Sequence, residues 1–335
     1  MVGSLVTPQG EVPLVTGHFG GRDRWGALLV RLGIGRMSYT VEPGLYAINH
    51  PGPDAPVLVT ANYKLSFDHL RRHLQDLAAW ILVLDTHGIN VWCAAGKGLF
   101  STAELVGRIK AVDLAQIITH RRLLLPQLSA PGIAAHAVRK QSGFKVVYGP
   151  IAARDLPAFL ANHQQATPAM RLKTFTLAER AVLVPVELTI ALKWAIPLSL
   201  VLLALRALAG AAGFWPTLVG QGFWPVAGLW AGVIAGSVAT PLLLPWLPGR
   251  AFAVKGLLAG LVAAALLALT PLPRLDHWAW FFLTPALASF LALEFTGAST
   301  FTSLSGVKKE MRIALPCQIG AGLIGAGLWL AGRFM

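Results

Sequence analysis

Cysteine and acidic residues are both scarce in this sequence of 335 residues. The chain has two cysteines, Cys93 and Cys317, and 15 acidic residues against 28 lysines and arginines. Two cysteines cannot build a disulfide framework, which excludes the small disulfide-rich class of secreted domains and predicts a reduced thiol at Cys93. They also cannot supply the four thiolates of an iron–sulfur cluster.

Charged residues are missing from two long stretches in the second half. None occurs between Ala207 and Gly249, and none between Ile313 and Gly332. Because a helix of about 20 apolar residues crosses a bilayer, we expect residues 188–335 to form an all-α transmembrane domain. Residues 1–187 are expected to form a soluble α/β domain. The five predicted spans lie near residues 188–209, 223–247, 252–272, 277–296 and 313–332.

A secretory signal peptide is not expected either, because Arg31 interrupts the first apolar run and no small-x-small cleavage site follows it. Basic residues gather on one side of the predicted spans, the side that normally faces the cytoplasm. They are Arg171, Lys173, Arg180, Arg250, Lys255, Lys308, Lys309 and Arg312. We therefore expect a multi-pass protein of the cytoplasmic (inner) membrane, with its N-terminal domain in the cytoplasm.

The net charge of +13 fits contact with anionic membrane lipid. No cluster of lysines and arginines lies on a recognisable nucleic-acid-binding module. Nucleic-acid binding is therefore not expected.

Strand and helix patterns alternate in the first half. Strands are predicted at 56–62, 81–86, 116–120 and 144–149, and helices at 66–80, 101–110 and 132–143. Ser101 and Glu104 have the spacing of a capping box, and Gly143 is placed to end a helix. The alternation predicts a parallel, doubly wound, Rossmann-like sheet, which binds ligands at the carboxyl ends of its strands.

The stretch "GINVWCAAGKG" (88–98) follows the second predicted strand, so Cys93 is expected at that edge. It is not a phosphate-binding P-loop, because Val91 replaces the first glycine and Gly98 replaces the final Ser or Thr. The residues alone leave two interpretations open. Cys93 is either a nucleophile with His87 or His120 as its base, or a buried structural thiol.

A family resemblance adds a third interpretation. "NVWCAAGKG", with "VTANYKLSFD" before it and "HRRLLLPQLSAPGIAAHAVRKQSGFKVVYGP" after it, resembles the corrinoid-binding domain of the corrinoid iron–sulfur protein large subunit over about residues 35–160. With "FTGASTFTSLSGVKKEM" (295–311), nearly the whole chain resembles the membrane-bound family of mercury-methylating corrinoid proteins, HgcA. Leu99 and Ser101 depart from the pattern expected there.

The resemblance implies a base-off, cobalamin-type corrinoid with Cys93 as the lower axial ligand of cobalt. Positive charge near a thiol favours the thiolate that binds metals, and small residues let the backbone approach a flat macrocycle. The implied cofactor-binding residues are Thr60, Asn62, Asn90, Val91, Trp92, Cys93, Ala94, Ala95, Gly96, Lys97, Thr119 and Gly149. A histidine-ligated cobalt is less favoured, because Gly88 comes too early for the Asp-x-His-x-x-Gly motif.

The implied activity is methyl transfer from methyl-cobalt(III) to inorganic mercury(II), forming methylmercury. A thiolate ligand would stabilise the electron-poor cobalt that remains. The implied partners are a methylated folate-dependent methyl donor and a ferredoxin-like iron–sulfur protein, HgcB, as electron donor. Two alternatives remain: a membrane-anchored corrinoid methyltransferase subunit with another acceptor, and a transporter with a soluble ligand-binding domain. Glu294 and Cys317 are functional candidates within the spans, with pairing and packing as their alternatives.

Overall fold

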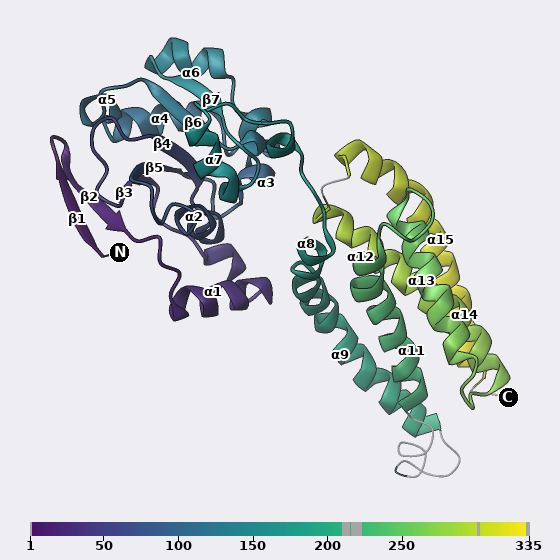
Figure 1. The fold of residues 1–335 in the computed structure, drawn as a ribbon. Helices are drawn as coiled ribbons and strands as arrows, with labels where there is room; N and C mark the ends of the chain where they lie inside the picture. Colours follow the sequence, from purple (N-terminus) through teal and green to yellow (C-terminus); the bar gives the residue numbers. More distant parts are fainter. Residues whose placement is uncertain (1, 210–214, 216–222, 300–301, 333–335) are drawn as a thin grey trace. The chain divides into compact units, whose positions relative to one another are not determined.

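The computed structural model describes residues 2–209, 215, 223–299 and 302–332 (Figure 1). The chain divides into two compact units. The first comprises Met1–Val30 and Ile34–Thr174, and the second comprises Arg31–Gly33 and Phe175–Met335. The main division therefore falls at residues 174–175, close to the end of the soluble part expected from the sequence.

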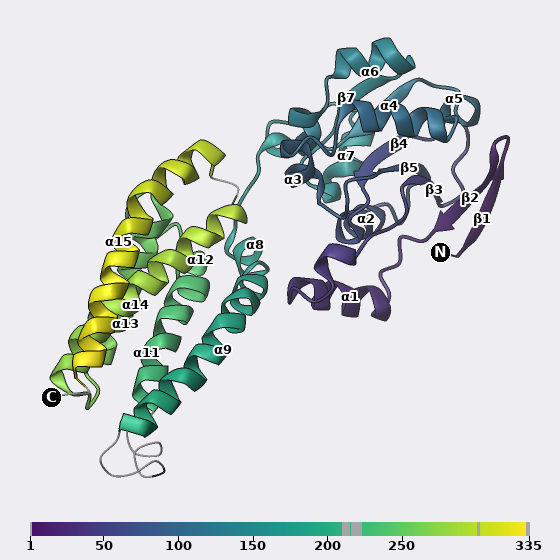
Figure 2. The same cartoon turned by 180° about the vertical axis from the view of Figure 1, so that it is seen from behind.

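The first unit is built on a seven-stranded sheet of order β1-β2-β3-β5-β4-β6-β7 (Figures 1 and 2). The strands are β1 (Gly3–Thr7), β2 (Gly10–Val15), β3 (Gly44–Ile48), β4 (Val57–Ala61), β5 (Ala79–Leu84), β6 (Arg122–Leu125) and β7 (Lys145–Tyr148). Strands β5, β4, β6 and β7 run parallel, whereas β3 runs antiparallel to β5 and β1 antiparallel to β2. The prediction of a wholly parallel sheet is therefore wrong, although its Rossmann-like core is present. Every residue of β4 and β5 is buried, as expected for strands covered on both faces.

Helices cover both faces of this sheet. Their bounds are α1 (Gly21–Arg31), α2 (Lys64–Arg71), α3 (Val91–Gly96), α4 (Thr102–Ala111), α5 (Leu114–Ile117), α6 (Ala135–Ser142) and α7 (Leu156–Ala161), with short 3₁₀ segments η1 (Arg36–Ser38), η2 (Gln127–Gly132), η3 (Ala153–Asp155) and η4 (Ala169–Arg171). Side chains of α3, α4, α5 and α6 share one buried cluster with the sheet, and those of α2 and α7 share another. The strands near 56–62, 81–86 and 144–149 and the helices that begin after Ser101 and end at Gly143 confirm the predicted pattern.

Two local predictions are wrong. The helix predicted over 66–80 ends at Arg71, because the Asn49 side-chain amide donates to the carbonyls of Leu74, Gln75 and Leu77 at 2.7, 2.8 and 3.0 Å. These bonds favour a turn, after which Ala79 begins β5. The strand predicted over 116–120 is absent because α5 extends to Ile117 and the next strand starts only at Arg122.

A buried ion network fixes α1 to α2. Asp23 on α1 accepts from Lys64 at 2.9 Å and from Arg71 at 2.7 Å, and Asp68 accepts from the same two cations at 2.6 and 2.7 Å. Burial raises the pKa of Asp23, but the hydrogen bonds and charges of Lys64 and Arg71 outweigh it, and the pKa falls to about 2. The ionised carboxylate therefore stabilises the fold at neutral pH.

Asp23→Asn should lower the free energy of unfolding by about 2 kcal/mol at pH 7, because it leaves two partly buried cations sharing one carboxylate. A depressed folded-state pKa stabilises above the ordinary value of 3.8, and this stabilisation is lost as pH falls from there to about 2. Denaturant unfolding across this range should therefore show the variant and the wild type converging. Asp76→Asn is the control, since Asp76 is exposed and pairs with no cation among the described residues. A constant difference between Asp23→Asn and wild type across that pH range would contradict the ionic account.

The described part of the second unit consists of helices and the turns that connect them. Its elements are α8 (Leu177–Ala181), α9 (Val184–Ala209), α11 (Phe223–Ile234), the π-helical turn η5 (Ala235–Ala239), α12 (Thr240–Leu243), α13 (Phe252–Leu267), α14 (Arg274–Glu294), η6 (Phe295–Gly297) and α15 (Leu304–Ala331). Among the residues that the structure describes, four helical stretches are long and apolar enough to cross a membrane: Leu177–Leu208, Phe223–Leu243, Arg274–Gly297 and Ser305–Ala331. The remaining predicted span corresponds to α13, whose 16 residues extend only about 24 Å at 1.5 Å each, less than a typical hydrocarbon core.

Glycines bring α13 and α14 into close contact. A Cβ at Gly260 would lie 2.5 Å from the Pro285 Cα, and one at Gly256 would lie 2.5 Å from the Ala288 carbonyl oxygen. Close backbone approach at small residues is how helices associate in lipid. Gly260→Leu should therefore lower the melting temperature of the purified chain in detergent by several degrees. Gly322→Leu on α15 is the matched control, because a Cβ there meets nothing within 4 Å, and equal losses from both variants would contradict the close-packing account.

Candidate functional site at the carboxyl edge of the sheet

Cys93 lies on α3, directly after the turn that follows β5. The stretch "GINVWCAAGKG" (88–98) therefore contains a short helix over Val91–Gly96. Its N-cap residue, Asn90, accepts a hydrogen bond from the Cys93 backbone N–H at 3.0 Å, and the Asn90 amide lies 3.5 Å from the Cys93 sulfur. Cys93 is half-buried and free of any disulfide. One asparagine thus sets both the helix start and the surroundings of the thiol.

A buried asparagine at the end of the neighbouring strand β4 holds the turn before α3. Asn62, 5% exposed at the end of β4, accepts from Thr86 N–H at 3.1 Å, the Thr86 hydroxyl at 2.9 Å and Gly88 N–H at 3.0 Å, and donates to Asp85 at 3.1 Å. The prediction that Asn62 lies at the carboxyl edge is confirmed. Its polar atoms serve the turn, so Asn62 positions Cys93 through the backbone.

Sequence reasoning missed the other residues that hold this turn. Glu104, expected only as part of a capping box, accepts a hydrogen bond from Asp85 N–H at 2.9 Å. Gly88 has φ +72° and lies so close to residues 37–40 that a Cβ would meet the Met37 carbonyl oxygen at 3.1 Å. The "DTHG" sequence signals a turn, but its partners are distant in the chain.

The predicted motif residues divide between the two sides of α3. Ala94 and Ala95 are buried in the core and Val91 packs against it, whereas Gly96 and Lys97 are exposed. A Cβ at Gly96 would meet nothing within 4 Å. Trp92 is half-buried beside Cys93. Cys93, Gly96 and Lys97 therefore lie on the accessible side of α3, while Ala94 and Ala95 fix the helix to the sheet.

Strands β6 and β7 also end at the carboxyl edge of the sheet. Gly149 follows β7 and is buried, its N–H bonded to the Leu125 carbonyl at 2.8 Å, and Thr60 is buried within β4. The segment η2 follows β6 and was not foreseen. Its Gly132 packs so tightly that a Cβ would lie 3.1 Å from the Ala95 Cα. The edge thus combines α3 with η2 and the residues that follow β4 and β7.

Thr119 does not belong to this edge, and its predicted position is wrong. It precedes β6, where its N–H bonds to the Pro53 carbonyl at 3.1 Å and its hydroxyl bonds to Asp54. His120 accompanies it, with Nε2 2.9 Å from the Ala55 carbonyl oxygen. Since Ala55 precedes β4, both residues lie at the amino ends of the parallel strands. His120 is therefore excluded as a base for Cys93.

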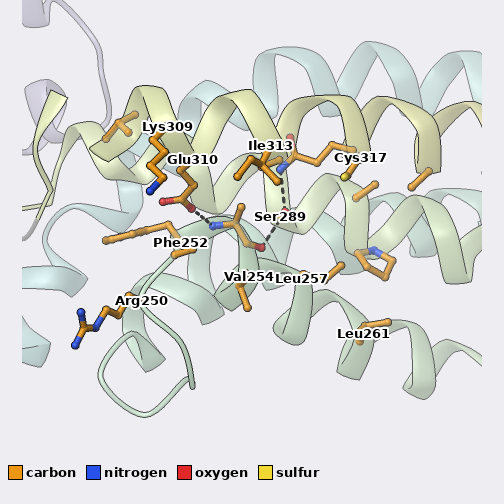
Figure 3. A pocket seen from close by; sticks show the side chains of 18 of the residues that line it. Arg250, Phe252, Val254, Leu257, Leu261, Ser289, Lys309, Glu310, Ile313 and Cys317 are labelled. Carbon is orange, nitrogen blue, oxygen red and sulfur yellow. Dashed lines mark hydrogen bonds between the residues drawn. The ribbon is translucent and has the colours of Figure 1, made fainter. Parts of the chain in front are cut away.

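The helical unit contains a separate groove of about 870 Å³ between α13, α14 and α15 (Figure 3). Cys317 lines it, beside a chain of hydrogen bonds from Gln318 to Ser289 at 2.8 Å and from Ser289 to the Ala253 carbonyl at 2.9 Å. Glu310 accepts from Ala253 N–H at 2.6 Å, near the start of α13. Glu294, the other candidate in this unit, is exposed at the end of α14.

The first unit is thus an α/β domain with a Rossmann-like core that presents one cysteine at the carboxyl edge of its sheet. Residues 35–160 match the family model of the CO dehydrogenase/acetyl-CoA synthase delta subunit. The acetyl-CoA decarbonylase/synthase complex subunit gamma of Archaeoglobus fulgidus is 35% identical over 118 residues, which cover 35% of this chain and 25% of the relative. The subunit gamma of Methanopyrus kandleri is 34% identical over 127 residues, 37% of this chain and 27% of the relative.

The chain thus spans about a quarter of the length of these curated relatives. The family-model match ends at residue 160, before the helical unit begins. Within these bounds, the matches support the resemblance of the α/β domain to the corrinoid iron–sulfur protein family.

Proposed function

We propose that the chain is a membrane-bound, corrinoid-dependent methyltransferase that methylates inorganic mercury(II), with Cys93 as the lower axial ligand of cobalt. The observation that carries this proposal is the position of the only cysteine in the first unit. Its sulfur lies at the carboxyl edge of a Rossmann-like sheet, beside the Asn90 amide. Ligands bind at this edge in such folds.

The residues present fit a corrinoid. A sulfur donor on a helix with an uncrowded Gly96 suits a flat macrocycle that must approach closely. When bound, the corrinoid supplies a cobalt centre that accepts and gives up methyl groups. Asn90 orients the sulfur, Asn62 keeps the preceding turn in place, and the exposed Lys97 adds positive charge at the same edge. Mercury(II) is the proposed substrate.

The partners and location follow from the same proposal. A ferredoxin-like iron–sulfur protein, HgcB, supplies electrons, because this chain's two cysteines cannot hold a cluster. A methylated folate-dependent donor supplies the methyl group. The four long apolar helices hold the protein in the cytoplasmic membrane, with the first unit in the cytoplasm.

A second acceptor remains a candidate because the relatives are subunits of the acetyl-CoA decarbonylase/synthase complex. In that case the chain is a membrane-anchored corrinoid subunit that gives its methyl group to a different molecule. Both candidate functions use the same residues around Cys93, so the methyl acceptor must be identified by assay.

The test has two stages. The full chain, purified in detergent with cobalamin, should carry about one cobalt per chain and an absorption spectrum that changes in Cys93→Ala. A chain that retains no cobalt would overturn the corrinoid proposal. The methylated protein is then offered mercury(II) and, separately, a thiol. Formation of methylmercury supports the proposed acceptor, whereas methylation of the thiol alone overturns mercury as substrate and leaves the corrinoid assignment standing.

A further inference from the structure

We propose that residues 21–30 of α1 and residues 34–37, all in the first unit, form an interfacial surface that lies on anionic lipid headgroups. This inference rests on the membrane location proposed above and is independent of the corrinoid chemistry. It gives the α/β unit its own contact with the bilayer, in addition to the covalent connection to the apolar helices.

The two faces of α1 differ sharply. One face is bound to the domain through Ala27 and Val30, which are 4% and 2% exposed, and through the ion pairs of Asp23. The opposite face carries Trp25 and Leu28, which are 62% and 46% exposed. Ile34 and Met37 continue the apolar surface beyond the helix, with 56% and 73% exposure. A helix that already packs by its small residues has no folding reason to present tryptophan and leucine outward.

Arginines surround this apolar surface. Arg22 and Arg24 are exposed and Arg36 is half-buried, and none of the three forms an ion pair within the described part of the chain. The one acidic residue of α1, Asp23, is occupied by Lys64 and Arg71 on the inner face.

This composition matches a bilayer surface better than a protein partner. Helices that lie in the interface carry tryptophan and leucine on one face and basic residues beside it. Tryptophan prefers the headgroup region, and arginines close to an anionic leaflet are attracted to it. Because the same chain carries helices long enough to span a membrane, the surface meets lipid at high effective concentration.

The surface is also connected to the candidate site. Residues 37–40 touch Gly88, and Val41 N–H bonds to the Asn62 carbonyl at 2.9 Å. Thr40 pairs with Tyr63 at the start of α2. The same few residues therefore join the apolar surface to the turn that precedes Cys93.

Photo-crosslinking of the full chain tests this surface directly. A benzophenone amino acid is placed at Trp25 or at Leu28 in protein reconstituted into nanodiscs of phosphatidylglycerol and phosphatidylcholine. His136, exposed on α6, is the matched control in the same unit, and Leu200, 63% exposed on α9, reports the bilayer itself. Lipid adducts at Trp25 and Leu28 should exceed those at His136 by roughly tenfold and approach those at Leu200.

The possible outcomes distinguish failure of the interfacial surface from failure of the proposed membrane location. Adducts at Leu200 with only background at both Trp25 and Leu28, or crosslinks from these positions to protein, would overturn the interfacial surface. Absence of adducts at Leu200 would overturn the membrane location, and the inference with it. Replacing phosphatidylglycerol with phosphatidylcholine should lower the yield at Leu28 several-fold, and a yield that ignores lipid charge would overturn the assignment to anionic lipid.

Discussion

Cys93→Ala should abolish the methylation of mercury(II) while the chain keeps its fold and much of its affinity for the corrinoid. The substitution removes the only cysteine of the first unit and leaves the backbone of α3 and the sheet in place. Loss of a metal ligand typically exceeds the 10- to 100-fold cost of losing a supporting residue, so we expect a rate lower by roughly 100-fold or more. The rate of methylmercury formation and the absorption spectrum of the bound corrinoid are the measurements.

Two further substitutions of Cys93 should give different losses of the methylation rate. Cys93→Thr should resemble Cys93→Ala, because a hydroxyl is a poor ligand for cobalt. Cys93→His offers a neutral nitrogen and should recover at most a small part of the rate. Cys317→Ala is the control, since Cys317 lies in the helical unit and should be dispensable for ligation. Native spectrum and native rate in Cys93→Ala would return Cys93 to the role of a structural thiol.

Asn62→Leu should destabilise the α/β unit and weaken corrinoid binding together. The change keeps the approximate size of the side chain but leaves Thr86 N–H and Gly88 N–H without their acceptor. An unsatisfied buried donor costs about 1–3 kcal/mol, so we expect the free energy of unfolding to fall by roughly 2–5 kcal/mol for the two amides. The Thr86 hydroxyl keeps the Ile89 carbonyl as its acceptor at 2.7 Å. Urea unfolding of the full chain in detergent measures the stability, and cobalt content measures the binding.

Asn162→Leu provides the matched control, because Asn162 is exposed and makes one side-chain bond, to the Gln165 carbonyl at 2.9 Å. Asn62→Asp should fall between wild type and Asn62→Leu. It keeps the acceptor oxygen but loses the donor and brings a second carboxylate beside Asp85. If Asn62→Leu bound corrinoid like the wild type despite lower stability, Asn62 would support the fold without positioning the site.

The sequence was most informative where a local pattern decides the structure. Continuous apolar runs marked β4 and β5, whose residues are all buried. Ser101 and Gly143 marked a helix start and a helix end through short-range backbone bonding. The position of Cys93 at the carboxyl edge followed from one strand and the turn after it.

Contacts between residues far apart in the sequence determined the features that the sequence did not predict. Nothing in residues 44–48 indicates that β3 runs antiparallel to β5, because both orientations bury the same side chains. Thr119 was misplaced because "QIITH" reads equally well as a short strand or as a buried helix end. The bonds of Asn62 to residues 85–88 span more than 20 positions, so no local motif contains them.

The order of the two units along the chain has a consequence for synthesis. All seven strands lie between residues 3 and 148, whereas the first stretch able to cross a membrane begins at Leu177. Nascent domains fold as units, N-terminal first, while translation adds about 5–20 residues per second. The sheet can therefore close on the ribosome before the apolar helices emerge. In the proposed membrane protein, insertion then begins with a folded domain already attached to the apolar helices.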